Sequence, residues 1–220
     1  QTCALPIYLF IDQLRNAVRS AGKMSEQRVP FSVRAEAMAG LRDWWAGRID
    51  TCFFNQIAGY TPQADTRYTG NQATIAPSSG NILVQGQSAE SSLTSSDTFV
   101  LGLIDSAVTL AKTMTPVIRP LKVDGEDRYV AFLHPYQVKS LRTSTSTGQW
   151  LDIQKAAMTG GQVSGNPIYT GAVGEYNNCI IHTAFRVPQG INSSTGVAIS
   201  TVRRSIFCGA QALAMAYGQG

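Results

Sequence analysis

The stretch that decides the fold is SVRAEAMAGLRDWWAGRIDTCFFNQIAG, residues 32–59. Ser32 is a typical helix N-cap and Gly59 is typical of the position just past a helix end, so the pattern predicts one long helix over residues 32–57. Its apolar side chains recur every four residues, at Val33, Ala37, Leu41, Trp45, Ile49 and Phe53. Because a step of four overshoots one turn by about 40°, this apolar stripe winds around the helix axis. We therefore expect the helix to need partners on more than one side.

A long polar tract, residues 60–98, follows the helix. Among many Ser, Thr, Asn, Gln, Gly and Pro residues it holds four charged ones, Asp65, Arg67, Glu90 and Asp97. Helical periodicity is absent, so the tract is predicted to be an extended loop with one strand at residues 81–84. Loops of this length are uncommon in compact domains and tend to be ordered by a binding partner.

The residues before the helix are expected to be an incomplete N-terminal arm. Residues 1–7 back-translate to a sequence that resembles a common sequencing-library adapter, so we expect them to be an artefact. Residues 8–31 are assigned to the arm, with a short helix at residues 12–21 that ends at Gly22. The first residue is not Met and the apolar run at residues 210–217 stops abruptly, so we expect a fragment truncated at both ends.

Residues 99–220 alternate short helical and strand patterns, which predicts an α+β body. Asp105 or Ser106 is a plausible cap for the first helix, and Pro135 is typical of the first position of the second. We expect helices at residues 106–114, 135–142 and 150–158. We expect strands at residues 117–123, 128–133, 167–170 and 178–182. The Asp124-Gly125 pair predicts a hairpin between the first two strands, and residues 196–217 are ambiguous between strand and helix.

Composition limits the classes of function. Charged residues make up 15% of the chain, well below the usual quarter, while the hydrophobic fraction of 44% is ordinary. A weakly charged surface is easier to bury against copies of the same protein than a heavily solvated one. The formal net charge of +4 and the pI near 9.0 are mild, and no Lys/Arg run occurs, so a dedicated nucleic-acid-reading domain is disfavoured. No apolar run is long enough to span a bilayer, so we predict no membrane partner.

Residues that could hold a metal or transfer a proton are few. His134 precedes Pro135 at a strand-to-helix junction, where we expect it to cap the helix and not to catalyse. Cys179 and His182 form a lone Cys-x-x-His, whereas zinc needs three or four ligands. The four cysteines show no CxxC pair, and those at apolar positions are expected to be small buried side chains: Cys52, Cys179 and Cys208, with Cys3 assigned to the artefact.

Nucleophilic and phosphate-binding motifs are equally incomplete. Ser20 and Lys23 match the Ser-x-x-Lys pattern of penicillin-binding enzymes, but neither companion motif follows. Glu126 and Asp127 follow a turn and are expected to be solvated. The glycines at residues 160–165 lack the strand-loop-helix placement that dinucleotide binding requires. We predict no catalytic, cofactor-binding or metal-ligating residue, and interpret the Trp44-Trp45 pair as a contact patch, with one ring facing the home domain and the other a neighbour.

Several blocks of sequence, in the same order, resemble the major capsid proteins of tailed bacteriophages of the podovirus type. The resemblance covers residues 22 to the end and is carried by GKMSEQRVPF (22–31), LRDWWAGRID (41–50), FFNQ (53–56), GYTPQ (59–63), DTRYTGN (65–71), FLHPYQ (132–137), NPIYTGA (166–172) and GEYN (174–177). It implies the tailed-phage major capsid fold, an α+β fold with a long spine helix, an extended loop, and peripheral and axial domains. On that mapping residues 32–59 are the spine helix, residues 60–98 the extended inter-subunit loop, and residues 99–220 the peripheral and axial body.

The resemblance also implies a function and partners. We expect a structural shell subunit of the virion, not an enzyme, that self-assembles through hexamers and pentamers in the host cytoplasm and encloses double-stranded DNA by non-specific electrostatics. Scaffolding, portal and decoration proteins are the further partners expected. One alternative is a bacterial nanocompartment shell of the same fold that encloses enzyme cargo. A remote alternative is an uncharacterised hydrolase that uses Ser20 or His134.

Overall fold

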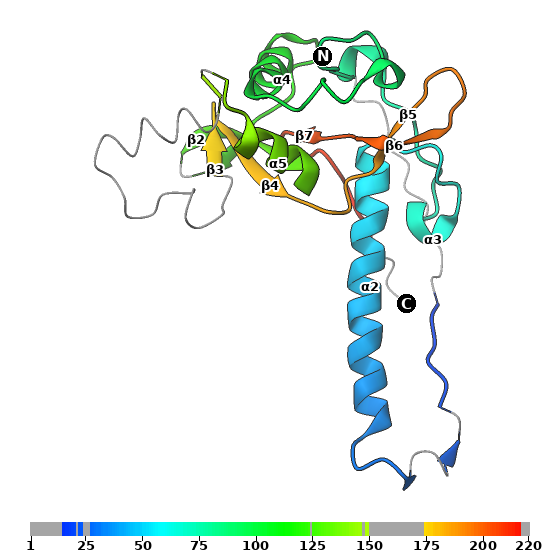
Figure 1. The fold of residues 1–220 in the computed structure, drawn as a ribbon. Coiled ribbons are helices and arrows are strands. Elements are labelled where there is room, and N and C mark those ends of the chain that lie inside the picture. The colour runs from blue at the N-terminus through cyan, green and yellow to red at the C-terminus, as the bar shows by residue number, and fades with distance from the viewer. Residues whose placement is uncertain are drawn as a thin grey trace, which may run out of the picture.

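A long helix projecting from a compact body dominates the computed structural model, which describes residues 15–20, 22–23, 27–123, 125–146, 148–149 and 174–216. Helix α2 spans Val33–Ile57, as predicted (Figure 1). The Ser32 hydroxyl caps its N-terminus by accepting a hydrogen bond from the Ala35 amide at 3.3 Å. Just past its C-terminus, Gly59 has a positive φ of +59°. The helix expected at residues 12–21 is wrong where it can be checked, because residues 15–20 are not helical. The arm there runs roughly parallel to α2 and stands apart from it in Figure 1.

The polar tract after α2 is mostly irregular, as predicted. It contains helix α3 (Thr66–Thr69) and the short 3-10 turns η1 (Ser79–Asn81) and η2 (Glu90–Ser92). The strand predicted at residues 81–84 is wrong: Asn81 ends η1, and residues 82–84 pair with no strand in the described part of the chain. Their apolar side chains line a cavity under the loop instead, so the short apolar run reflects partial burial and not strand pairing.

The body holds a mixed sheet built around strand β2 (Glu126–Leu133). Across the described residues, the strand order is β1 (Leu121–Val123), β2, β4 (Cys179–Thr183) and β3 (Gly174–Tyr176), and β7 (Ile206–Cys208) also pairs with β2. Strands β2 and β4 are parallel, whereas the other pairs are antiparallel. Strands β5 (Gln189–Ile191) and β6 (Ala198–Arg203) form a separate two-stranded sheet.

Most sequence predictions for the body are confirmed, with shifted boundaries. The β1–β2 hairpin pairs Val123 with Glu126 around Gly125, whose φ is +85°. The first strand is shorter than predicted and begins at Leu121. Residues 196–217, left ambiguous by sequence, contain strands β6 and β7. The helix predicted at residues 150–158 and the strand at residues 167–170 lie outside the described residues.

Two helices flank the sheet. Helix α4 covers Leu101–Thr113, so its predicted start at residue 106 is wrong. Its N-cap is Val100, not Asp105 or Ser106, because Leu101 and Ile104 are buried in the core and extend the helix past the local cap signals. Helix α5 covers Pro135–Thr143, as predicted within one residue.

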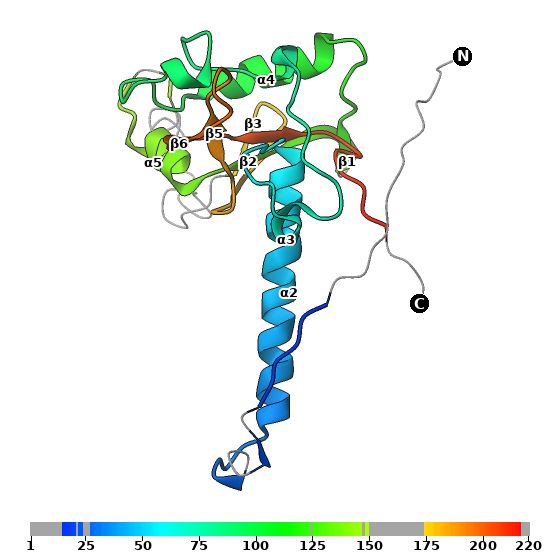
Figure 2. The same cartoon turned by 90° about the vertical axis from the view of Figure 1, so that its right-hand side faces the viewer.

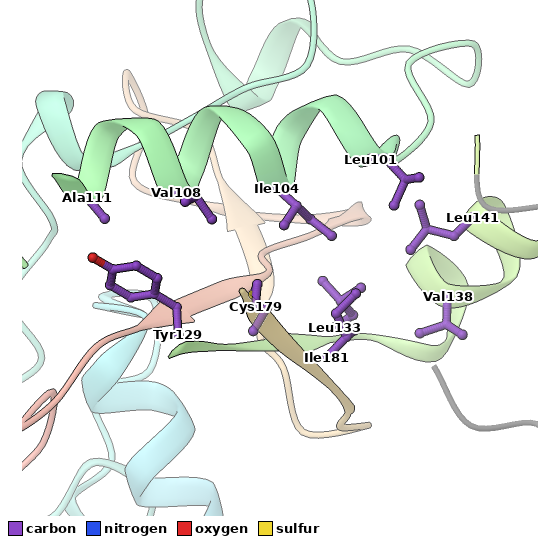
Figure 3. Packing of buried hydrophobic residues seen from close by; sticks show 11 residues of the cluster. Leu101, Ile104, Val108, Ala111, Tyr129, Leu133, Val138, Leu141, Cys179 and Ile181 are labelled. Atoms are coloured by element: carbon purple, nitrogen blue, oxygen red, sulfur yellow. The ribbon is translucent and has the colours of Figure 1, made fainter. Parts of the chain in front are cut away.

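Each face of the sheet packs against a different helix. Successive side chains of β2 point to opposite faces of the sheet, so its odd-numbered residues face α4 and its even-numbered residues face the end of α2. The first face forms the main core with side chains from α4 and α5 (Figure 3): Leu101, Ile104, Val108, Ala111, Tyr129, Ala131, Leu133, Val138, Leu141, Cys179 and Ile181. The second face forms a smaller cluster from Ala58, Ile206 and Cys208 with Phe54, Ile57 and Phe132. The body therefore holds only the C-terminal end of α2.

Candidate assembly surface

The C-terminal half of α2 is tied to its own loop by polar side chains. Asn55 donates to the carbonyl of Tyr68 at 2.9 Å, and Gln56 donates to the carbonyls of Thr69 at 2.6 Å and Gln72 at 2.7 Å. One turn or more earlier, Arg48 donates to the carbonyl of Arg67 at 2.9 Å. Helix side chains thus satisfy loop carbonyls that no helix or sheet partner would satisfy. Residues 66–72 are held along the helix without an apolar core of their own.

Arg186 makes the next tie, from the turn after β4 to the middle of α2. Its guanidinium donates to the Gly47 carbonyl at 2.8 Å and to the Thr51 hydroxyl at 2.7 Å, and lies 2.7 Å from the Asp50 carboxylate. A β-carbon on Gly47 would lie 2.9 Å from an Arg186 nitrogen, so the glycine makes room for the contact. These ties end at residue 47, and the helix projects from there.

The third tie is a buried ion pair at the junction of loop, helix and body. Arg204 contacts both carboxylate oxygens of Glu90, at 2.7 and 2.8 Å, and donates to the Ala58 carbonyl at 2.8 Å. Glu90 also accepts from the Ile191 amide at 2.8 Å, and both charged side chains are only 12% exposed. We call this set of contacts the latch. It fixes η2, the end of α2 and the β5–β6 sheet to one another.

The N-terminal half of α2 carries large apolar side chains that water reaches. We call residues 31–46 the projecting segment. Phe31 is 58% exposed, Met38 49% and Trp44 41%, whereas Trp45 is half-buried. Phe31, Met38 and Trp44 are spread over about four turns of the helix and the residue before it. These exposed side chains make the projecting segment the candidate surface for contact with another protein.

The tryptophan pair is only partly arranged as predicted. The rings of Trp44 and Trp45 contact each other edge to face, with centroids 5.1 Å apart, and the Arg48 guanidinium lies 5.1 and 5.4 Å from them. Trp45 is half-buried and contacts Trp44 and Arg48 on the same helix. Trp44 remains the more exposed ring, available to a neighbour.

The remote hydrolase reading finds no support in the positions of Ser20 and His134. His134 caps α5: its ring nitrogen accepts from the Tyr136 amide at 3.3 Å, while the Gln137 side chain accepts from the His134 amide at 2.9 Å. Burial, assisted by the Arg203 charge, lowers the His134 pKa. The Ser20 hydroxyl accepts a hydrogen bond from the Gly22 amide in the arm. The predicted capping role of His134 is confirmed.

Other candidate chemical groups are also accounted for structurally. Cys179 is buried and His182 exposed on the same strand, and their odd spacing directs them to opposite faces. Burial raises the pKa of Cys179 to about 12 and that of Cys208 to about 11, so both remain neutral thiols. Cys52 is half-buried and less enclosed than predicted, and its pKa is also raised by burial. Within the described ranges, no cluster of His, Cys, Asp or Glu could hold a metal ion.

Glu126 and Asp127 are exposed, but each has a partner. Glu126 pairs with Arg128, and Asp127 pairs with Lys122 across the β1–β2 hairpin. A cavity of about 560 Å³ lies between the loop, α4 and β6–β7, and the ionisable groups that line it include the latch pair. Glu90 and Arg204 neutralise each other, but Asp97 and Arg203 also line the cavity, and one buried guanidinium nitrogen of Arg203 has no hydrogen-bond partner among the described residues.

Sequence reasoning did not identify the residues that hold the loop and helix in place. Glu90, Arg186 and Arg204 are separated from their partners by more than 100 residues along the chain. The sequence offered only a weak signal for them. Each is a charged residue with few charged neighbours in a chain that carries little charge overall. No helix among the described residues has the length and apolar content needed to cross a membrane.

Comparisons with known proteins identify the family. The family model described as phage capsid protein matches residues 7–220. The major capsid protein of Pseudomonas phage KPP25 is 27% identical over 232 residues, covering 94% of this chain and 60% of that protein. The capsid of Ralstonia phage GP4 is similar in structure, with a TM-score of 0.63 and 32% identity, over 80% of this chain and 52% of that one.

A second solved structure supports the fold alone. The cyanophage Pam1 capsid matches 73% of this chain and 48% of its own with a TM-score of 0.51 and 15% identity. The chain thus spans between about half and three fifths of the relatives it matches. The predicted resemblance to tailed-phage major capsid proteins and the α+β capsid fold are confirmed. This chain belongs to the phage capsid protein family.

Proposed function

We propose that the protein is a structural subunit of a tailed-bacteriophage head, which self-assembles into a closed icosahedral shell around double-stranded DNA. It acts in the virion, is assembled in the cytoplasm of the host, and catalyses no reaction. Hexamers and pentamers of the chain form the shell, with scaffolding, portal and decoration proteins as further partners. The capsid relatives favour this reading over a nanocompartment that holds enzyme cargo.

One observation supports self-assembly most directly: the projecting segment leaves Phe31, Met38 and Trp44 exposed on a helix that its own body does not cover. Full burial of one such side chain stabilises a contact by about 1.5–3 kcal/mol. Exposed tryptophan is also the residue type most often dominant in protein interfaces. A second copy that covers the segment would gain this energy, and a stable contact would bury on the order of 1,000 Å² or more.

The segment roles belong to the same proposal. We assign residues 32–59 to the spine helix, residues 60–98 to the loop between subunits, and residues 99–220 to the peripheral and axial domains. The latch and the contacts of Asn55 and Gln56 position the loop on its own chain. A loop held in this way presents its exposed residues, such as Ile75 at 84% exposure, in a fixed place for a neighbour.

Expression of the complete reading frame that contains this sequence tests the proposal. We expect closed shells of uniform size by electron microscopy. The Met38→Ala/Trp44→Ala variant should keep the monomer's circular dichroism spectrum but assemble at least tenfold less well, because it loses two exposed apolar contacts and not a core contact. Tyr136→Ala, which truncates a 67%-exposed aromatic residue on the body, is the matched control and should assemble normally. A full-length protein that stays monomeric even with its scaffold would contradict the proposal.

A further inference from the structure

Positive charge is distributed unevenly along the chain. Residues 15–48, which comprise most of the arm and the N-terminal two thirds of α2, hold seven of the 18 Lys and Arg residues but three of the 14 Asp and Glu residues. This one stretch therefore carries the whole formal net charge of +4, and the rest of the chain is neutral. The arm and the projecting part of α2 extend away from the body in both views (Figures 1 and 2). The molecule thus has a neutral body and a basic projection.

Five cations of this stretch are exposed to solvent and make no ion pair within the described part of the chain: Arg19, Lys23, Arg28, Arg34 and Arg42. Arg48 differs, because it contacts both tryptophans and the Arg67 carbonyl. The remaining exposed cations produce a field that attracts a polyanion.

Among the described residues from Asp50 onward, each carboxylate already has an ion-pair or hydrogen-bond partner in its own chain. Five of them pair with a cation of their own chain, Asp50, Asp65, Glu90, Asp127 and Glu175. Glu126 shares Arg128 with Glu175. Asp97 accepts hydrogen bonds from Thr94, and Asp105 accepts from Tyr176 and Asn177. The projection itself carries the exposed carboxylates Glu36 and Asp43 beside the five exposed cations, so it keeps an excess of positive charge that a polyanion complements better than these paired carboxylates do.

We infer that the described residues of the arm and the projecting helix, 15–20, 22–23 and 27–48, form the surface of this subunit that faces the enclosed double-stranded DNA and contacts its phosphates without reading sequence. The inference rests on the proposed function, since a shell subunit that encloses DNA must present some face to it. Contacts of this kind are salt-dependent and carry no base specificity.

The same helix can serve a neighbouring copy and DNA at once. At 100° per residue, Arg42 lies about 160° around the helix from Trp44. The two side chains thus leave α2 in nearly opposite directions. Trp44 can pack on a sister subunit while Arg42 points to phosphate.

Salt-dependent binding to a 30-base-pair duplex of random sequence tests the inference. The variant is Arg19→Gln/Arg28→Gln/Arg42→Gln, and the matched control is Lys112→Gln/Lys139→Gln/Arg142→Gln, which removes the same charge from exposed positions on α4 and α5. Fluorescence anisotropy gives the binding constant from 50 to 300 mM NaCl. The logarithm of the binding constant falls with the logarithm of the salt concentration, and each lost phosphate contact makes this slope shallower by about 0.9. The slope of the triple variant should therefore be shallower than that of the wild type by about 2.7, and the slope of the control should change by close to zero.

Two outcomes would overturn the inference. Equal slopes for the variant and control would show that the projection does not meet DNA. Stronger binding of poly-glutamate than of DNA at matched charge would assign the projection to an acidic protein instead. Electron microscopy of the same preparations separates this result from the proposed function: shells that form normally while the slopes are equal would refute only the DNA-facing surface.

Discussion

The latch gives the sharpest stability prediction. Glu90→Gln keeps the size of the side chain and an oxygen that can accept from the Ile191 amide, but it removes the negative charge beside Arg204. Because the Arg204 side chain is only 12% exposed, its guanidinium would remain buried without a counter-charge. Removal of one partner from a buried ion pair costs about 3–5 kcal/mol. That is a large part of the roughly 5–15 kcal/mol by which a folded domain is stable.

Urea unfolding followed by circular dichroism measures this loss. The control is Lys122→Met, which breaks the exposed Lys122–Asp127 pair and should cost about 0–1 kcal/mol. The double variant Glu90→Gln/Arg204→Met completes a double-mutant cycle. It should be less destabilised than the sum of the single variants, since it leaves no lone buried charge. A Glu90→Gln loss as small as that of Lys122→Met would refute the view that charge pairing holds the loop to the body.

Substitutions at Gly59 and His134 test which residues fix the start of the loop and the start of α5. Gly59→Ala should destabilise the protein by about 1–3 kcal/mol in urea unfolding, because Gly59 has φ of +59° and a β-carbon would collide with the Ile75 carbonyl. Gly102→Ala, in α4 with open space around it, should instead be neutral or stabilise by about 0.5–1 kcal/mol; a similar loss at both sites would contradict the first expectation. His134 is held neutral by its lowered pKa, so its contribution is present above its ordinary pKa of about 6.5 and is lost as the pH falls. His134→Asn keeps a capping acceptor that does not titrate, so its melting temperature should fall less than that of the wild type between pH 7 and 5; parallel curves would contradict the linkage.

Elements that depend on neighbours in sequence could be predicted. The limits of α2 follow from Ser32 and Gly59, the β1–β2 hairpin from Gly125, and the cap of α5 from His134 before a proline. Each of these signals acts within about five residues. The start of α4 could not be predicted from residues close in sequence. It is set by burial of Leu101 in the core and not by a local cap.

The assembly surface could be predicted only in part. The winding apolar stripe predicted that α2 needs partners on more than one side, and Trp44, which lies beside the stripe, is exposed on the half that projects from the body. The position of the boundary between the covered and projecting halves could not be predicted, since it depends on Arg186 reaching Gly47 across 139 residues. The latch was missed because Glu90 and Arg204 each look like an ordinary solvated charge in sequence. Contacts between residues far apart in the chain produce no periodic pattern in the sequence near either residue.

The contrast between the two halves of α2 links folding to assembly. The C-terminal half is stabilised by donors to its own loop and by packing on the second face of the sheet. The projecting half has neither, and an isolated helix of that length is marginal in water. It stays helical chiefly as a continuation of the anchored half, so a neighbour that covers Met38 and Trp44 would stabilise both the contact and the helix. Assembly and completion of the helix are then one coupled process.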